Sequence, residues 1–311
     1  MTATELSVII PVRDESTNIP VLTDRLKTTL NSLQLSFEII FVTDINKDNT
    51  VQVLKEQYQL DNRVKYVKLS RSYGQHVAVV AGLNASVGDY AVIMDGDLQD
   101  EPEDIPALYN KIKSGFDIVY GVKETKNESA LRNLVTRLFL HVISNLSDVN
   151  MDFNTSMFRI ISRKTINEVL KYKEIEPSLT FIMGSLNLPT EKVMVASGKR
   201  FSGKTQYPLS RQFRFALTSL LSFSTKPIEY VSILGLLISL ISFIYFIVVM
   251  FQRMSNGIAV LGWPTIIALI TLLGGMQLFA IGIIGQYIGK IFLQTKNRPL
   301  YVVEEQVGIE S

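Results

Sequence analysis

Two long uncharged apolar stretches near the C-terminus constrain this chain more than any other feature. They run from Tyr230 to Phe251 and from Pro264 to Ile288. Each is as long as the ~20 apolar residues that a helix needs to cross ~30 Å of hydrocarbon. The short link between them, residues 252–263, carries one charge, Arg253. The sequence therefore predicts a helical hairpin of two membrane spans, preceded by a domain of a different kind.

Basic residues flank the outer ends of this hairpin. Lys226 precedes the first span, and Lys290, Lys296 and Arg298 follow the second. Because positive residues stay on the cytoplasmic side, both termini are expected in the cytoplasm. The chain runs from Met1 almost directly into a strand-like segment, without a basic region and a long apolar run, so we expect no secretory signal.

Two further features relate to the membrane. Residues 210–223 combine phenylalanine and leucine with Arg211 and Arg214, which is typical of a helix lying on a bilayer surface, although a core-packing helix is the alternative. In the second span, glycines recur at near-heptad spacing and form a small-residue face. This face favours close helix contact, within the hairpin or between subunits. The glycines are Gly275, Gly282, Gly285 and Gly289.

The first half of the chain alternates short apolar runs with amphipathic stretches. This alternation predicts a largely parallel sheet with helices on both faces. The expected strands are Leu6–Pro11, Phe37–Thr43, Val64–Leu69, Tyr90–Asp95, Asp117–Val122, Met157–Ser162 and Lys192–Ala196. The expected helices are Ile19–Leu33, Thr50–Gln57, Gln75–Ala85, Ile105–Lys113, Leu131–Leu146 and Lys164–Tyr172. Ligands of such sheets bind at the carboxyl ends of the strands, so functional residues should follow the strands.

Composition excludes several classes of function. The chain has no cysteine, which excludes a disulfide framework, a thiolate metal site and a cysteine nucleophile. A net charge of +2 gives no global basic field, so a nucleic-acid partner is not expected. No G-x-G-x-x-G follows the first strand, which argues against a dinucleotide-dependent dehydrogenase.

The strongest chemical signal is a pair of acidic residues, Asp95 and Asp97, at the end of the fourth expected strand. Burial cannot neutralise both carboxylates, so they need a cation or hydrogen-bond donors. Oxygen ligands suit Mg²⁺ or Mn²⁺, which bridge to substrate phosphates and stabilise a diphosphate leaving group. The alternative is a solvated acidic turn at the start of the next helix.

Several motifs together resemble one enzyme family. VIMDGDLQDEPE resembles the metal-binding signature of glycosyltransferase family 2, in the branch that includes dolichol-phosphate mannose synthase and bacterial undecaprenyl-phosphate sugar synthases. SVIIPVRDE (Ser7–Glu15) is similar to its opening strand and nucleotide-contacting loop, and LSRSYGQHVAVVAGL (Leu69–Leu83) to its third-strand loop and helix. The match is collinear over about residues 5–225, and the hairpin resembles one subgroup's anchor.

The resemblance implies an α/β fold of the nucleotide-sugar-binding GT-A type, followed by interfacial helices and a two-helix transmembrane hairpin. It divides the chain into a cytoplasmic catalytic domain (1–207), an amphipathic juxtamembrane helix (208–228), the hairpin (229–290) and a cytoplasmic C-terminal tail (291–311). It places the protein in a bacterial inner or plasma membrane. Together with the glycine face it favours a homo-oligomer, with a tetramer as one candidate.

The resemblance also assigns roles to individual residues. Asp95, Asp97 and Gln99 would hold Mg²⁺ or Mn²⁺ on the donor diphosphate, and Asp97 would be catalytic. The nucleotide-sugar pocket would be lined by Pro11, Arg13, Glu15, Asp44, Arg71, Asp95, Arg200 and Lys204. No partner gives His76 a metal-binding role, so a structural role is favoured for it, and His141 is expected to pack.

A lipid-phosphate acceptor needs positive charge more than a general base, because a phosphomonoester is mostly dianionic at pH 7. Arginine suits bidentate phosphate recognition. Arg132, Arg137 and Arg159 are candidates, and the family pattern favours Arg132 and Arg159 as catalytic residues.

The implied activity is an inverting, metal-dependent transfer of a sugar from a nucleotide-sugar to a polyprenyl phosphate, with a UDP-sugar favoured over a GDP-sugar. The loop Thr43-Asp44-Ile45-Asn46 departs from the family's usual acidic pair followed by Gly-Ser, which leaves the base preference and the loop geometry open. Two alternatives remain: a membrane-tethered transferase acting on a polysaccharide or protein, and a non-catalytic nucleotide-binding membrane scaffold.

Overall fold

The computed structural model of the chain describes residues 4–123, 157–174, 177–196, 226–256 and 263–309. The helices expected at Leu131–Leu146 and at residues 210–223 lie outside these residues. The chain divides into two compact units. One comprises Met1–Leu140, Val149–Gln206 and Arg298–Ser311, and the other His141–Asp148 and Tyr207–Asn297.

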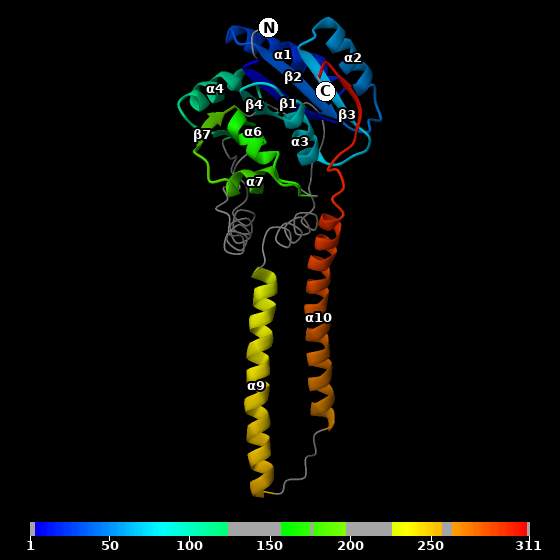
Figure 1. Cartoon of the computed structure of the whole chain (residues 1–311), viewed down its shortest axis with the longest axis vertical. Coiled ribbons are helices and arrows are strands. Elements are labelled where there is room, and N and C mark those ends of the chain that lie inside the picture. The colour runs from blue at the N-terminus through cyan, green and yellow to red at the C-terminus, as the bar shows by residue number, and fades with distance from the viewer. Residues whose placement is uncertain (1–3, 124–156, 175–176, 197–225, 257–262, 310–311) are drawn as a thin grey trace. The chain divides into compact units, whose positions relative to one another are not determined.

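The first unit is built on an eight-stranded mixed sheet of order β7-β5-β6-β4-β1-β2-β3-β8 (Figure 1). The strands are β1 (Leu6–Val12), β2 (Phe37–Thr43), β3 (Val64–Leu69), β4 (Tyr90–Ile93), β5 (Ile118–Lys123), β6 (Arg159–Ser162), β7 (Thr190–Val195) and β8 (Val303–Val307). Four neighbouring strands, β3, β2, β1 and β4, pair in parallel, as do β5 and β7. β6 runs antiparallel to β4 and β5, and β8 antiparallel to β3. The mostly parallel α/β sheet confirms the predicted fold class.

Helices cover both faces of this sheet, as the alternating apolar runs predict. They are α1 (Asn18–Ser32), α2 (Thr50–Leu60), α3 (Gln75–Ala85), the 3₁₀ turn η1 (Pro102–Asp104), α4 (Ile105–Lys113), α6 (Arg163–Val169) and α7 (Leu179–Ser185). Successive side chains of a strand point to opposite faces. Val8 and Ile10 of β1 therefore pack in one core cluster with Leu26 of α1, whereas Ile9 packs in the other with Val79 of α3.

Two elements of this unit have no counterpart among the predicted ones. α7 falls in a stretch that the sequence left without an element. β8 lies in the region expected to form a tail after the hairpin, where the chain instead adds an edge strand to the sheet. The return of the C-terminus to the sheet means that residues before and after the apolar helices belong to one folded unit.

The second unit contains two long apolar helices, α9 (Lys226–Asn256) and α10 (Trp263–Thr295), which contact one another. Ile228–Tyr245 and Leu273–Thr295 are long and apolar enough to cross a membrane, by length and composition. Large apolar side chains on both helices are exposed, for example Leu236 (70%) and Leu278 (73%). A Cβ added at Gly275, Gly282, Gly285 or Gly289 would meet no atom of the described residues within 4 Å.

Candidate active site

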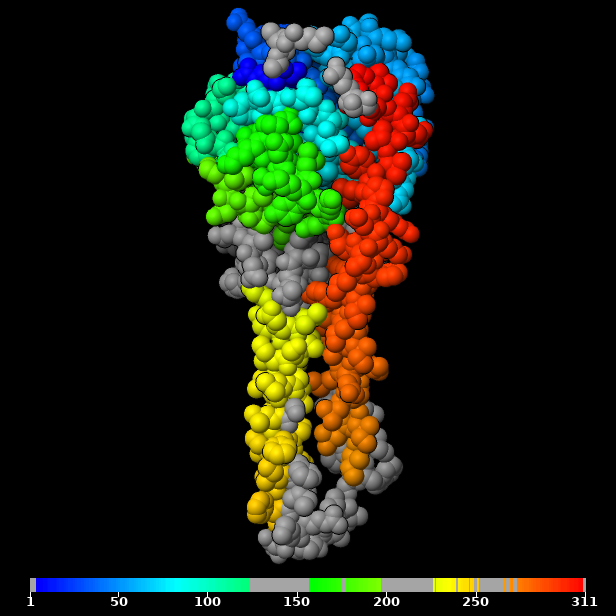
Figure 2. Space-filling model, viewed as in Figure 1, coloured from blue at the N-terminus to red at the C-terminus, as the bar shows by residue number. Residues whose placement is uncertain are grey.

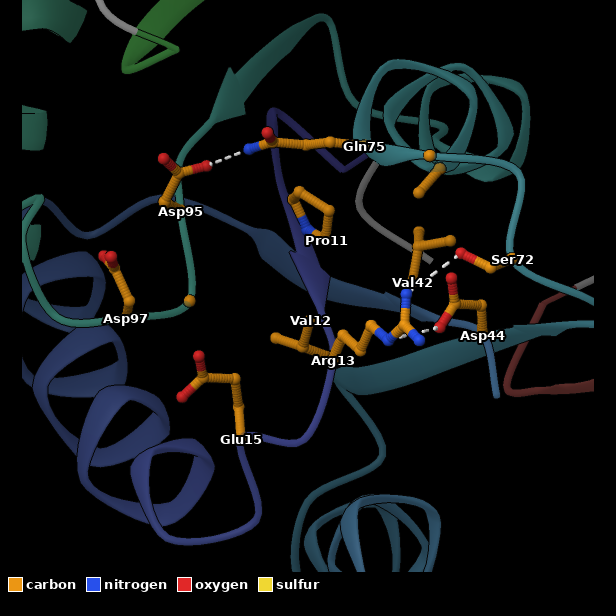
Figure 3. Close-up of a pocket in the computed structure, with 13 residues that line it drawn as sticks. Pro11, Val12, Arg13, Glu15, Val42, Asp44, Ser72, Gln75, Asp95 and Asp97 are labelled. Carbon is orange, nitrogen blue, oxygen red and sulfur yellow. Dashed lines mark hydrogen bonds and ion pairs between the residues drawn. The ribbon is translucent and has the colours of Figure 1, made fainter. Parts of the chain in front are cut away.

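A pocket of about 330 Å³ lies at the carboxyl ends of the parallel strands β1, β2 and β4 (Figure 3). The residues that line it come from the ends of β1 and β2, from the loops after β1, β2, β3 and β4, and from the start of α3. They are Pro11, Val12, Arg13, Glu15, Val42, Asp44, Ser72, Gly74, Gln75, Ala78, Asp95, Gly96 and Asp97. Figure 3 shows Asp95 and Asp97 on one side of the pocket and Asp44 with Arg13 on the other. This position is where parallel sheets bind their ligands.

The wall formed by β1 and β2 combines a cation with a buried carboxylate. Arg13 donates a hydrogen bond from Nη1 to Ser72 Oγ (3.2 Å), and its Nε lies 3.8 Å from Asp44 Oδ1. That oxygen of Asp44 is buried and accepts no hydrogen bond from the described residues. A buried acceptor without a donor costs free energy, so this wall is suited to a ligand that carries an N–H group.

The unusual loop after β2 is tied to the loop after β1 by side-chain hydrogen bonds. The backbone N–H of Asp14 donates to Asn46 Oδ1 (3.0 Å), and that of Ser16 to Asp48 Oδ2 (3.0 Å). Asn46 Nδ2 donates in turn to Thr43 Oγ1 (2.8 Å). Burial raises the pKa of Asp48, but the hydrogen bonds from Thr50 and Ser16 outweigh it and lower that pKa to about 2. Thr43 and Asn46 thus hold this loop in place without the family's usual acidic pair.

The opposite wall is acidic. Burial, together with the like charges of Asp100 and Asp97, raises the pKa of Asp95 to about 7, against the lowering influence of Lys123 and Gln75. Asp97 accepts hydrogen bonds from Gln99, through the backbone N–H (3.2 Å) and the side-chain amide (2.8 Å). Two carboxylates that share a pocket and repel one another provide oxygen ligands for a divalent cation.

The glycine between the two acids packs closely against Val12. A Cβ at Gly96 would lie 2.6 Å from Val12 Cγ1, closer than side-chain carbons approach one another. The backbone after β4 therefore packs directly against the end of β1. This contact fixes where Asp95 and Asp97 enter the pocket.

The loop between β3 and α3 contributes a part of the site that the sequence analysis missed. Ser72, Gly74 and Gln75 line the pocket, whereas Arg71, the residue predicted from this loop, stacks on the Tyr73 ring at 4.6 Å and does not line it. Gln75 Nε2 donates to Asp95 Oδ1 (2.5 Å). The available signal is that Ser72, Gly74 and Gln75 lie between the end of β3 at Leu69 and the first turn of α3, at the carboxyl end of a parallel strand.

The guanidinium of Arg159 is 1% exposed and interacts electrostatically with Asp95. It sits 5.1 Å from the Tyr120 ring centroid and donates from Nε to the Met157 carbonyl oxygen (3.2 Å). Burial lowers the pKa of Arg159, and the charges of Tyr120 and Asp95 oppose the shift. Burial lowers the pKa of His76, and the positive charge of Arg159 lowers it further. The buried Nδ1 of His76 has no hydrogen-bond partner in the described part of the chain.

The remaining predicted site residues fall into two groups. Gln99 supports Asp97 and is not among the residues lining the pocket. Arg132, Arg137, His141, Arg200 and Lys204 lie outside the described residues. The pocket thus brings together Pro11, Arg13, Glu15, Asp44, Asp95 and Asp97, six of the predicted residues.

Comparison with known proteins agrees with this geometry. The model of glycosyl transferase family 2 matches residues 7–170. The chain is 31% identical to the uncharacterized glycosyltransferase YkcC of Bacillus subtilis, covering 99% of this chain and 95% of the relative. It is 28% identical to the undecaprenyl-phosphate 4-deoxy-4-formamido-L-arabinose transferase of Proteus mirabilis, covering 98% and 95%.

A solved structure shares the fold. It is the glucosyl-3-phosphoglycerate synthase from Mycobacterium tuberculosis in complex with Mn²⁺ and UDP-glucose, with a TM-score of 0.51 and 18% identity over 72% of this chain and 79% of that one. The family model covers more than half of the chain, the B. subtilis relative matches it over nearly its full length, and the pocket lies where the family's signature motifs meet. The chain therefore belongs to glycosyltransferase family 2.

Proposed function

We propose that this chain transfers a sugar from a UDP-sugar to a polyprenyl phosphate such as undecaprenyl phosphate. The observation that carries the proposal is the placement of Asp44 across one pocket from Asp95 and Asp97. The buried Asp44 oxygen can accept a hydrogen bond from a ring N–H, which uracil offers and guanine also offers. A nucleoside diphosphate would lie between the two walls, with its base at Asp44 and its diphosphate at the acidic wall. A UDP-sugar is favoured, and a GDP-sugar is the alternative donor.

Mg²⁺ or Mn²⁺ fits the acidic wall. Asp95 and Asp97 would hold it, and diphosphate oxygens and water would complete its shell, since these ions keep several waters in protein sites. Burial and the like charges of Asp100 and Asp97 raise the pKa of Asp95, and a bound cation would offset this cost of ionising it. When bound, the ion would neutralise charge on the leaving nucleoside diphosphate.

The chain's own residues would position the two substrates. A phosphate oxygen of the lipid attacks the anomeric carbon from the face opposite the diphosphate. The new C–O bond forms as the bond to the diphosphate breaks, which inverts the configuration. A dianionic phosphate needs no proton removed. Arg159 is 1% exposed and does not line the pocket, so we propose that its charge attracts an acceptor phosphate through the electrostatic field rather than by contact, and that Arg132 binds the phosphate.

The acceptor class is supported by the two long apolar helices and by the P. mirabilis relative, whose name specifies undecaprenyl phosphate. We propose that α9 and α10 anchor the protein in the bacterial inner membrane with the catalytic domain and both termini in the cytoplasm. β8 pairs with β3 of the catalytic sheet, so the chain must enter and leave the hairpin on the same side of the membrane. A hairpin of two membrane spans returns the chain to the side on which it entered, whereas a single span would leave it on the opposite side.

The test is transfer of radiolabelled sugar by purified full-length protein to undecaprenyl phosphate with Mn²⁺. We expect label in an organic-solvent-extractable lipid, and loss of that label in Asp97→Ala. Asp24→Ala, an exposed carboxylate on α1, is the matched control and should retain full transfer. Undiminished transfer by Asp97→Ala would reject the metal role. Label in a water-soluble polymer would reject the lipid acceptor, and metal-dependent UDP binding without turnover would indicate a non-catalytic protein.

A further inference from the structure

The C-terminal segment, residues 298–309, lies against the catalytic sheet although it follows the apolar hairpin in sequence. β8 pairs antiparallel with β3, placing Tyr66 opposite Val307 and Lys68 opposite Glu305. Figure 2 shows the C-terminal segment, in red, on the surface of the domain beside its blue and cyan parts. Without β8, β3 would be an edge strand with an unpaired row of backbone groups.

Ion pairs and hydrogen bonds fix β8 on the sheet. Glu305 accepts a hydrogen bond from Tyr66 Oη (2.8 Å) and forms an ion pair with Lys55 of α2 (3.0 Å). Glu304 pairs with Lys68 of β3. Beyond β8, Gly308 has φ +76°, and a Cβ there would lie 2.8 Å from the Tyr58 ring and 2.9 Å from Lys65 Cγ. The segment is thus docked by specific contacts along its length.

The same segment contacts the loop after β3, residues 70–75, which forms part of the donor pocket. The backbone N–H of Ser70 donates to the Val302 carbonyl oxygen (2.9 Å). Tyr73 packs on the α3 side of the core together with Leu300 and Tyr301. Hydrogen bonds from Ser70 and from the backbone of Val302 to Tyr73, with the neighbouring Arg71, lower the pKa of that tyrosine.

On its other side, this loop contacts both walls of the pocket. Ser72 Oγ accepts the hydrogen bond of Arg13, the partner of Asp44, and Gln75 donates to Asp95. Between them, Gly74 adopts φ +90°, a conformation that permits the sharp turn into α3. Residues 70–74 have no regular secondary structure, and Gln75 is the first residue of α3. The geometry of the loop therefore depends on what it packs against.

We infer that the C-terminal segment is a positioning element for the donor pocket: by holding residues 70–75 it preorganises Ser72 and Gln75 and so strengthens binding of the nucleotide-sugar. This inference rests on the proposed function of the same pocket. The physical reason is that a loop held in its bound conformation loses less conformational entropy when the ligand binds. The chemistry at the anomeric carbon does not involve the segment, so its loss affects donor binding rather than turnover at saturation.

The main test reverses the charges of β8 in the full-length protein with Glu304→Lys and Glu305→Lys together. We expect the KM for the UDP-sugar to rise about fivefold, because exposed ion pairs are individually weak, while kcat and the KM for the lipid stay within about twofold. Amide hydrogen exchange should become faster at residues 303–307 and 70–75 and remain unchanged in α1. Glu168→Lys, which breaks the exposed Glu168–Lys171 pair on α6, is the matched control and should leave donor KM unchanged.

Two further variants make the result decisive. The charge swap Lys68→Glu with Glu304→Lys should restore most of the donor affinity that Glu304→Lys alone loses. Deletion of residues 299–311 should raise donor KM by at least about tenfold with kcat retained. Unchanged donor KM in a deletion variant that folds would overturn the inference. A deletion variant that no longer folds would show a general structural role and also overturn it. A wild-type protein that neither binds UDP nor transfers sugar would instead refute the proposed function.

Discussion

Asp44 Oδ1 lies 3.8 Å from Arg13 Nε, and it is buried without a hydrogen-bond donor among the described residues. Ion pairing at this distance leaves the oxygen free to accept from a ligand. We expect Asp44→Ala to weaken UDP binding by about 10- to 100-fold, the equivalent of one hydrogen bond to a charged group. Isothermal titration of UDP in the presence of Mn²⁺ measures the effect.

Two comparisons show whether this effect concerns the base. Ribose-5-phosphate and pyrophosphate lack a base, so their binding should be unaffected by Asp44→Ala. Asp24→Ala on the exposed face of α1 should bind UDP like the wild type. An equal loss for pyrophosphate and UDP would contradict a role for Asp44 in base recognition.

The contact between Gly96 and Val12 predicts a rescue experiment. A methyl group at position 96 would lie 2.6 Å from Val12 Cγ1, so in Gly96→Ala either the Val12 side chain or the backbone that carries Asp95 and Asp97 must shift, and we expect the backbone to shift. A displacement near 1 Å costs about 100-fold in rate when it moves catalytic groups. We expect kcat/KM to fall to that extent in Gly96→Ala.

The double variant Gly96→Ala with Val12→Ala removes the clashing methyl group and should regain most of the activity. Val12→Ala alone is the control, and it should cost less activity than Gly96→Ala. Failure of the double variant to recover would mean that the glycine is needed for a reason other than this contact.

The sequence predicted those parts of the fold and site that depend on local pattern. Short β-branched runs indicate the strands of the parallel core. Asp44, Asp95 and Asp97 line one pocket, as expected from their position in the loops after β2 and β4. Because ligands bind at the carboxyl ends of parallel strands, the order of strands and acidic residues predicts a binding pocket at this position.

The features that were missed depend on contacts between distant segments. β8 reads Val-Glu-Glu-Gln-Val, a weakly patterned acidic stretch, and its partners Tyr66 and Lys68 lie more than 200 positions earlier. Likewise, the residues of β6 do not indicate that this strand runs antiparallel to β4 and β5. The bond from Gln75 to Asp95 joins two loops that the sequence shows only separately. No local propensity encodes such pairings.

Glu38 of β2 lies at the centre of a buried network of hydrogen bonds and an ion pair, and its loss should strongly destabilise the fold. Glu38 is 2% exposed; it accepts from Ser7 Oγ (2.6 Å) and the Val87 backbone N–H (2.8 Å), and it pairs with Lys65 (2.8 Å). Glu38→Ala leaves these buried donors without an acceptor, so we expect the free energy of unfolding to fall by about 3 kcal/mol. Thermal unfolding in detergent measures it, with Glu56→Ala on α2 as the control. A shift in melting temperature no larger than that of the control would contradict the prediction.

Asp61, at the end of α2, predicts a stability change that depends on pH. Hydrogen bonds from Arg63 lower its pKa to about 2 against the opposing effect of burial, and Lys27 lies 3.3 Å away. A carboxylate whose pKa is lower in the folded state stabilises the fold above its unfolded pKa of ~3.9, and this contribution is lost as pH falls through about 2. We expect Asp61→Asn to cost about 2 kcal/mol at pH 7. The difference from wild type should shrink by about half at pH 3, because the wild-type protein by then loses part of the same contribution. Thermal unfolding of both proteins at the two pH values measures this, with Asp24→Asn as the control, and a difference of equal size at pH 7 and pH 3 would show that the ion pair is not its source.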